Sequence, residues 1–169
     1  MNAHPGGEAH TRRMLELAAL PEGARILDLG AGAGGTVSLL RELGYAAEGI
    51  DLAPRSDVVT TGDLLHTVFP GSSFDAVLSQ CSFYVAGDIP AALRESWRLL
   101  KTEGRLLWSD VFFEEPRPLL EKAGFELLCA EDMTPIWKEY YIEALWRGTA
   151  DCRVPRGRCS YWLLIGRKV

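Results

Sequence analysis

Residues 26–36 read ILDLGAGAGGT, an apolar run followed at once by four glycines. The run predicts a buried strand over residues 24–29, and residues 35–44 predict a helix that ends at Gly44. Glycine permits a tight turn and lets a ligand approach the backbone closely. A glycine-rich turn between a strand and a helix therefore predicts an α/β fold with a nucleotide-binding loop.

The rest of the chain continues this alternation of strands and helices. Helices are predicted over residues 8–20, 116–124 and 137–146, and over residues 88–101, where Asp88 is the expected N-cap. The alternation indicates a Rossmann-like, doubly wound sheet with helices on both faces. Six further strands are predicted over residues 46–51, 57–61, 74–79, 104–110, 125–131 and 160–166.

Two connections depart from a regular α/β pattern. Only residues 52–56 separate the strands predicted at 46–51 and 57–61, whereas a crossover helix needs a dozen or more residues. We therefore expect the helix after the second strand to be shortened or missing. A long aromatic segment precedes residues 160–166, so an antiparallel final strand is possible.

Composition limits the class of function. With 169 residues, 47% hydrophobic and 24% charged, the chain is predicted to be a single domain over residues 1–169. Its net charge of −5 argues against nucleic-acid and anionic-membrane partners. No apolar run approaches the roughly 18 residues of a membrane span, and the N-terminus lacks a secretory signal. Four cysteines, interpreted as free thiols, favour a cytoplasmic protein.

Two nucleotide-loop templates fit the glycines. The pattern G-x-G-x-x-G beginning at Gly30 is the dinucleotide fingerprint, with Asp51 at a suitable distance for a ribose hydroxyl. The pattern D-x-G-x-G-x-G beginning at Asp28 is that of methyltransferases that use S-adenosylmethionine. A carboxylate beside the loop would repel a pyrophosphate at the helix N-terminus. S-adenosylmethionine carries an ammonium and a sulfonium and no phosphate, so Asp28 favours the second template.

Further motifs follow in order along the chain. They are GIDLAP at 49–54, GDLLH at 62–66, FDAVLSQCSFY at 74–84, LRESWRLLKTEGRLLWSD at 93–110 and YWLLIGRK at 161–168. With these motifs the chain resembles class I S-adenosylmethionine-dependent methyltransferases, especially the small-molecule branch with quinone-biosynthesis and arsenite methyltransferases. The resemblance implies a seven-stranded sheet of order 3-2-1-4-5-7-6, with strand 7 antiparallel. The short link after Asp51 departs from the family pattern, as do Thr102 and Glu103, which replace Pro and Gly.

The resemblance also implies which residues hold the cofactor. Asp51 would bind both ribose hydroxyls, Asp63 the adenine amino group, and the Leu64 backbone N–H the adenine ring. Asp28 would help to hold the methionine end. The complete set that the motifs imply is Asp28, Gly30, Ala31, Gly32, Asp51, Leu52, Asp63, Leu64, Gln80 and Cys81.

The acceptor side is less constrained by sequence. The implied strand order places residues 132–160 across the ligand edge as a substrate-side wall, and residues 1–21 as a lid helix. Trp137 and Tyr141, with Tyr140 beside them, are predicted to line the acceptor pocket, although aromatics at helical spacing more often pack in a core. Asp110 is the first candidate for substrate contact, with capping of the next loop as the alternative.

Catalysis needs few groups. Methyl transfer is an in-line displacement that alignment alone can accelerate, so a general base is optional. Asp110 and His66 are the weak candidates for a base. His10 and Arg13 lie on the predicted lid helix.

Cysteines and arginines in the wall raise two further possibilities. Cys81, Cys152 and Cys159 together would suit arsenite or another thiophilic acceptor, although free buried thiols are the favoured interpretation. Their spacing does not match a common zinc site, so no metal is predicted. A basic loop that could dock an anionic substrate contains Arg153, Arg156 and Arg158.

The sequence therefore predicts an enzyme that transfers a methyl group from S-adenosylmethionine to a small-molecule acceptor. Two alternatives stay open. One is a module that binds S-adenosylmethionine without catalysis. The other is a dinucleotide-dependent oxidoreductase, which Asp28 disfavours.

Overall fold

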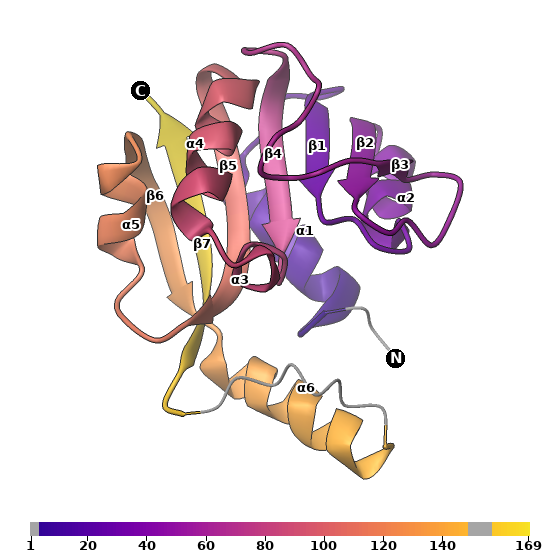
Figure 1. Cartoon of the computed structure of the whole chain (residues 1–169), viewed down its shortest axis with the longest axis vertical. Helices are drawn as coiled ribbons and strands as arrows, with labels where there is room; N and C mark the ends of the chain where they lie inside the picture. The colour runs from indigo at the N-terminus through magenta and orange to yellow at the C-terminus, as the bar shows by residue number, and fades with distance from the viewer. Residues whose placement is uncertain (1–3, 149–156) are drawn as a thin grey trace.

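One mixed sheet forms the centre of the protein. In the computed structural model, which describes residues 4–148 and 157–169, seven strands pair in the order β3-β2-β1-β4-β5-β7-β6 (Figure 1). Neighbouring strands from β3 to β5 are parallel, while β7 is antiparallel to both β5 and β6. The strands are β1 (Arg25–Leu29), β2 (Ala46–Asp51), β3 (Thr60–Thr61), β4 (Phe74–Gln80), β5 (Leu100–Phe112), β6 (Phe125–Asp132) and β7 (Ser160–Lys168).

This topology confirms the predicted strand order and the antiparallel final strand. It also confirms the missing helix, because no helix lies between Asp51 and Thr60. Two strands differ from the prediction by more than two residues at one end. The third strand is only two residues long, since only Ile50 and Asp51 pair with it. The fifth begins directly after the preceding helix, where Leu100 pairs with Phe74 ahead of an irregularity in the register.

Helices cover both faces of the sheet. In Figure 1, α4 lies in front of β4 and β5, while α1 and α2 lie behind. The predicted cap of α4 is confirmed, because Asp88 Oδ1 accepts a hydrogen bond from the Ala91 N–H at 2.9 Å. The short helix α3 was not predicted. The helices are α1 (Gly7–Ala18), α2 (Gly35–Glu42), α3 (Phe83–Ala86), α4 (Ile89–Leu99), α5 (Arg117–Lys122) and α6 (Thr134–Trp146).

Apolar side chains fill the space on each side of the sheet. The face covered by α4 and α5 packs around Trp108, Phe74 and Leu93, all almost completely buried. The opposite face packs Met14 of α1 and Leu40 of α2 against the sheet. Because both faces are closed, a ligand must bind at an edge, and in open α/β sheets that is the carboxyl edge.

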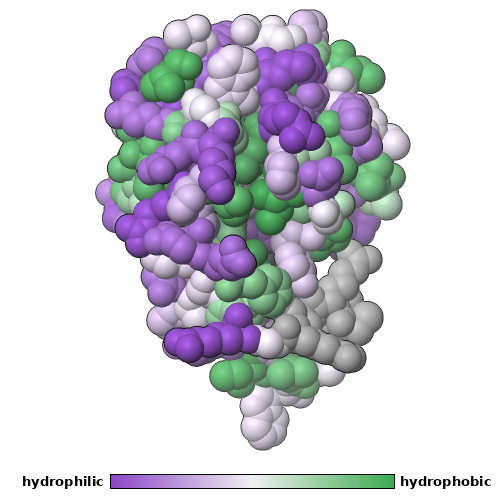
Figure 2. All heavy atoms as spheres, turned by 60° about the vertical axis from the view of Figure 1, so that its left-hand side comes forward, coloured by the Kyte–Doolittle hydropathy of each residue, from purple (hydrophilic) through white to green (hydrophobic). Residues whose placement is uncertain are grey.

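The carboxyl ends of the parallel strands meet at the lower edge in Figure 1, next to the start of α1 and above α6. The helix α6 projects from the sheet there and exposes Ile142, Leu145 and Trp146. Figure 2 shows hydrophobic side chains reaching the surface at this projecting end. Among the described residues, none of the helices combines the length and the apolar character that crossing a bilayer requires.

Candidate functional site

The glycine loop after β1 needs glycine for both conformation and space. Gly30, Gly32 and Gly34 have φ values of 84°, 54° and 79°, a region that other residues rarely adopt. A Cβ on Gly30 would lie 2.1 Å from Ser82 Oγ, far inside van der Waals contact. The N–H groups of Gly30 and Ala31 both donate to the Ile50 carbonyl at 2.9 Å, which fixes the loop to β2.

The short link after β2 folds back onto this loop. Asp51 Oδ2 accepts from the Gly32 N–H at 2.9 Å, and Oδ1 accepts from the Ala53 N–H at 2.9 Å. The Arg55 N–H donates to the Gly32 carbonyl at 3.0 Å, and Ser56 Oγ donates to the Ala33 carbonyl at 2.8 Å. The link therefore covers the glycine loop in place of the missing helix. Sequence reasoning missed Arg55 and Ser56, although a link too short for a helix was a signal that it must pack on the adjacent loop.

Asp28 is a buried carboxylate at the mouth of the loop, 3% exposed. Burial, with a smaller contribution from the neighbouring charge of Asp51, raises the pKa of Asp28 to about 7. Among the described residues, no hydrogen-bond donor reaches its side chain. Such a group is stabilised by a cation placed beside it.

Gln80, at the end of β4, connects the sheet to the N-terminal helix. Its Oε1 accepts from Thr36 Oγ1 of α2 at 3.2 Å, and its Nε2 donates to Thr11 Oγ1 of α1 at 3.2 Å. Its Nε2 also contacts Met14 Sδ at 3.6 Å. These contacts tie α1 to the carboxyl end of β4, and the role of residues 1–21 as a lid stays a prediction.

Replacing Gln80 with leucine is expected to loosen α1 without unfolding the sheet. Loss of about one net hydrogen bond, roughly 1 kcal/mol, raises the open population several-fold. Trypsin should then cleave after Arg12 and Arg13 roughly five times faster, because cleavage follows the open population when opening is rapid. Glu8→Gln is the control, since it removes only the exposed pair between Glu8 and Arg12. Equal cleavage rates for Gln80→Leu and wild type would contradict this role of Gln80.

The residues predicted for the adenine side lie at the carboxyl ends of β2 and β3. Asp63 Oδ1 accepts from the Leu65 N–H at 2.8 Å, and its other oxygen lies 3.7 Å from His66 Nδ1. The Leu52 side chain is exposed, and so is the His66 ring. A base role for His66 stays a prediction, and among the described residues its ring forms no ion pair beyond the one with Asp63.

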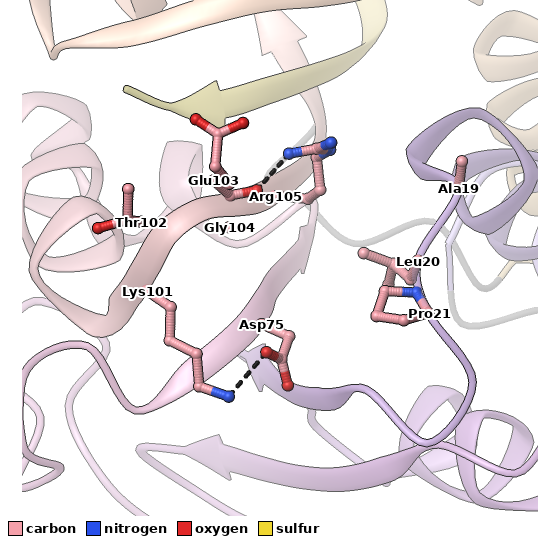
Figure 3. Close-up of a pocket in the computed structure, with 9 residues that line it drawn as sticks. All are labelled: Ala19, Leu20, Pro21, Asp75, Lys101, Thr102, Glu103, Gly104 and Arg105. Carbon is pink, nitrogen blue, oxygen red and sulfur yellow. Dashed lines mark hydrogen bonds and ion pairs between the residues drawn. The ribbon is translucent and has the colours of Figure 1, made fainter.

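Two hollows of about 210 Å³ each lie at opposite edges of the sheet. The one drawn in Figure 3 lies at the amino ends of β4 and β5, where Lys101 already pairs with Asp75 at 2.7 Å. The other lies between α1 and the first turn of α2, and is lined by Thr11 and Thr36 among others. Only the second adjoins the glycine loop.

Comparison with known proteins agrees with this geometry. Residues 27–108 match the family described as a methyltransferase domain. The match takes in 82 of the 169 residues, just under half of the chain. It is 31% identical over 134 residues to an uncharacterized methyltransferase, YodH, of Bacillus subtilis, covering 71% of this chain and 57% of that protein. It is 32% identical over 126 residues to a demethylmenaquinone methyltransferase of Tropheryma whipplei, covering 65% of this chain and 51% of that enzyme.

The chain spans little more than half the length of these curated relatives. Comparison with solved structures extends the similarity in fold to almost the whole of this chain. Phosphoethanolamine N-methyltransferase 2 of Haemonchus contortus, in complex with S-adenosyl-L-methionine, superposes with a TM-score of 0.77 at 20% identity. The alignment covers 98% of this chain and 53% of that one, and at this identity it shows the fold alone.

The residues predicted for the acceptor side form a separate aromatic cluster. Trp137 of α6 packs with Val111 of β5 and Tyr161 of β7, and the Tyr141 ring lies 5.0 Å from that of Trp137. Sequence reasoning missed Tyr161, which is fully buried at the start of β7. An antiparallel final strand begins at the ligand edge, and that was the available signal.

Cys81 packs against this cluster, and Asp110 precedes its member Val111 in β5. Asp110 is 1% exposed and accepts hydrogen bonds from the Tyr84 N–H at 3.0 Å and the Val111 N–H at 2.9 Å. Burial raises the pKa of Asp110 to about 6. Burial, with Asp110 next, raises the pKa of the Cys81 thiol to about 12, so it is protonated at neutral pH. The Asp110 carboxylate supports the start of α3, and its direct contact with a substrate stays a prediction.

The structure describes only some of the cysteines and arginines that the sequence analysis singled out. Cys152, Arg153 and Arg156 lie outside the described residues. Cys159 packs against the aromatic cluster, and burial raises the pKa of its thiol. Within residues 4–148 and 157–169, no group of three or more metal-ligating side chains converges.

Proposed function

We propose that this chain binds S-adenosylmethionine at the glycine loop and transfers its methyl group to a small-molecule acceptor. The observation that carries the proposal is Asp28, a buried carboxylate at the mouth of the loop to which no donor in residues 4–148 or 157–169 hydrogen-bonds. A ligand that brings positive charge stabilises this group, whereas a pyrophosphate adds repulsion. The methyltransferase-domain match supports the same conclusion.

The donor set around the loop fits each end of this cofactor. Thr11 and Thr36 line the hollow beside the first turn of α2, where the free backbone N–H groups of a helix start suit a carboxylate. Asp28 suits the ammonium and sulfonium. At the other end, Asp51 would hold the ribose hydroxyls, while Asp63 and Leu64 would hold the adenine. The other residues of the proposed cofactor site are Gly30, Ala31, Gly32, Leu52, Gln80 and Cys81.

When bound, S-adenosylmethionine supplies an electrophilic methyl group on a sulfonium sulfur. The contribution of this chain is to orient the two reactants and to exclude water. The Gln80 contacts keep α1 over the site, and the cluster of Trp137 and Tyr141 supplies an apolar wall for the acceptor. A net charge of −5 argues against a nucleic-acid acceptor, and the free thiols fit a cytoplasmic enzyme.

One observation favours a dinucleotide as a second candidate. The Arg55 guanidinium lies over Gly32, where a Cβ would be 2.7 Å from its Nη2. A guanidinium in this position could pair with a phosphate. The buried charge of Asp28 on the same loop opposes that ligand, so we rank the dinucleotide second.

Thermal melts with S-adenosylmethionine, S-adenosylhomocysteine and NAD separate these candidates. A ligand at about a hundred times its dissociation constant stabilises by roughly 2.7 kcal/mol, which is about 5–10 °C for a chain of this size. We expect both sulfur compounds to raise the melting temperature and NAD to leave it unchanged. A shift with NAD alone would reject the proposal. Cofactor binding without release of S-adenosylhomocysteine across a broad acceptor panel would instead indicate a binding module.

A further inference from the structure

His10 is a buried imidazole without a hydrogen-bond partner. It lies on α1, is 3% exposed, and neither ring nitrogen contacts a donor or acceptor among the described residues. Burial is the main cause that lowers the pKa of His10 to about 4, so the ring is neutral at physiological pH. One nitrogen of a neutral imidazole donates and the other accepts, so His10 offers both functions unused.

Trp137 is a second buried group of this kind. Its side chain is 8% exposed, and its indole Nε1 has no hydrogen-bond partner among the described residues. An indole N–H can only donate. Buried polar groups are nearly always paired, because an unpaired one costs free energy that a suitable ligand can recover.

These two groups border the same region at the carboxyl edge. The His10 ring lies 5.9 Å from the Tyr161 ring, and Trp137 belongs to the same buried cluster as Tyr161. The residue just before α1 also approaches α6, since a Cβ on Gly6 would lie 2.7 Å from His10 Cβ and 3.5 Å from Ile136 Cγ2. Tyr161 itself is already satisfied, because its hydroxyl donates to Ser109 Oγ at 3.1 Å.

The surroundings favour a neutral, flat ligand. The cluster consists of aromatic and aliphatic side chains, with Val111, Tyr161 and Tyr141 around Trp137. The charged group that acts on His10 is Glu131, which is already paired with Arg13 at 2.6 Å. His4, the other neighbour of His10, has its pKa lowered by burial. An ionised ligand would lose its hydration here without gaining a counter-charge.

We propose that His10 and Trp137 are the polar contacts of the methyl acceptor, and that this acceptor is a neutral aromatic molecule bearing a hydroxyl group. One hydroxyl can pair with both residues, since it donates its proton to the unprotonated imidazole nitrogen and accepts from the indole N–H. The ring packs against the aromatic cluster. This assignment rests on the proposed methyl transfer, and the acceptor reaches the site when α1 moves away from Gln80.

Calorimetric titration of the full chain with 2-naphthol tests the assignment, with and without saturating S-adenosylhomocysteine. We expect wild type to bind 2-naphthol at least tenfold more tightly than 2-methoxynaphthalene, which cannot donate, or 2-naphthoate, which is charged. His10→Phe and Trp137→Phe should each weaken binding of 2-naphthol about tenfold, which is about 1.4 kcal/mol. Trp146→Phe, a substitution at an exposed position of the same helix, should bind as wild type does.

Stability without ligand provides a second readout. Because the imidazole nitrogens are unpaired, His10→Phe should melt a few degrees above wild type. A lower melting temperature would mean that the imidazole has a structural partner, and would overturn the assignment. Failure of 2-naphthol to bind wild type, or equal binding to both variants, would overturn it too. A different result would separate the two proposals. If wild type does not bind S-adenosylhomocysteine, but His10→Phe still weakens 2-naphthol binding, the proposed cofactor is wrong and the contacts of His10 and Trp137 stand.

Discussion

Gly30→Ala is expected to lower the melting temperature by about 10 °C and to abolish binding of S-adenosylmethionine. Two effects combine. Alanine at a φ of 84° costs about 1–2 kcal/mol, and its Cβ would lie 2.1 Å from Ser82 Oγ, so the loop must also shift at a further cost of about 1–3 kcal/mol. For a chain of this size each kcal/mol lowers the melting temperature by about 2–4 °C.

The chain contains a matched control for the conformational part of this effect. Gly44 has a φ of 89°, but a Cβ there would meet no atom within 4 Å. Gly44→Ala should therefore lower the melting temperature by only a few degrees and leave cofactor binding intact. The double variant Gly30→Ala with Ser82→Gly should recover part of the lost stability. If Gly30→Ala and Gly44→Ala have the same melting temperature, the close approach of Gly30 to Ser82 does not constrain the residue at position 30.

Asp28→Asn is expected to stabilise the ligand-free protein at pH 8 while weakening S-adenosylmethionine binding at least tenfold. The pKa of Asp28 is about 7 in the folded protein, above its ordinary value of 3.8. The folded state thus binds more protons than the unfolded state between these values, and the contribution of Asp28 to stability falls as the pH rises through this window. Above pH 7 the variant should gain roughly 2 kcal/mol, since the amide avoids a buried charge but is itself incompletely paired.

Denaturant unfolding of wild type and Asp28→Asn at pH 4 and pH 8 isolates the contribution of the Asp28 charge to stability. The other titratable groups are the same in the two proteins, so their contributions cancel. The gain in stability should vanish near pH 4, where the wild-type carboxyl is neutral. The affinity of wild type for S-adenosylmethionine should rise as the pH increases towards 7, and that of the variant should not. Equal stabilities at pH 8 would show that Asp28 has a partner in the folded protein.

Asp110→Asn is the control of opposite sign. Asp110 is equally buried, but backbone N–H groups of Tyr84 and Val111 and the Trp108 indole N–H donate to its carboxylate. In the asparagine variant, the side-chain NH2 group would face N–H groups that now donate to a carboxylate oxygen. Two donors cannot pair, so this variant should lose stability. The two substitutions together separate an unpaired carboxylate from a structural one.

The sequence by itself determined the local elements and the identity of the loop. Hydrophobic periodicity, glycine positions and Asp88 determine where helices and strands begin, because these depend on residues only a few positions apart. The absence of a helix after Asp51 followed from the small number of residues between the second and third strands. The position of Asp28 ahead of the glycines was enough to favour a cationic cofactor. Strand order came from the motifs and the resemblance they carry.

Only the tertiary structure decided which polar groups have partners. Asp110 and Asp28 look alike in sequence, yet one accepts from three N–H groups and the other from none among the described residues. The His10 ring contacts Tyr161, which lies far from it in the sequence, and Arg55 covers Gly32 because β2 pairs with β1. Burial and pairing are set by long-range contacts that no local pattern contains, and here those contacts distinguish the groups available to a ligand from those that hold the fold.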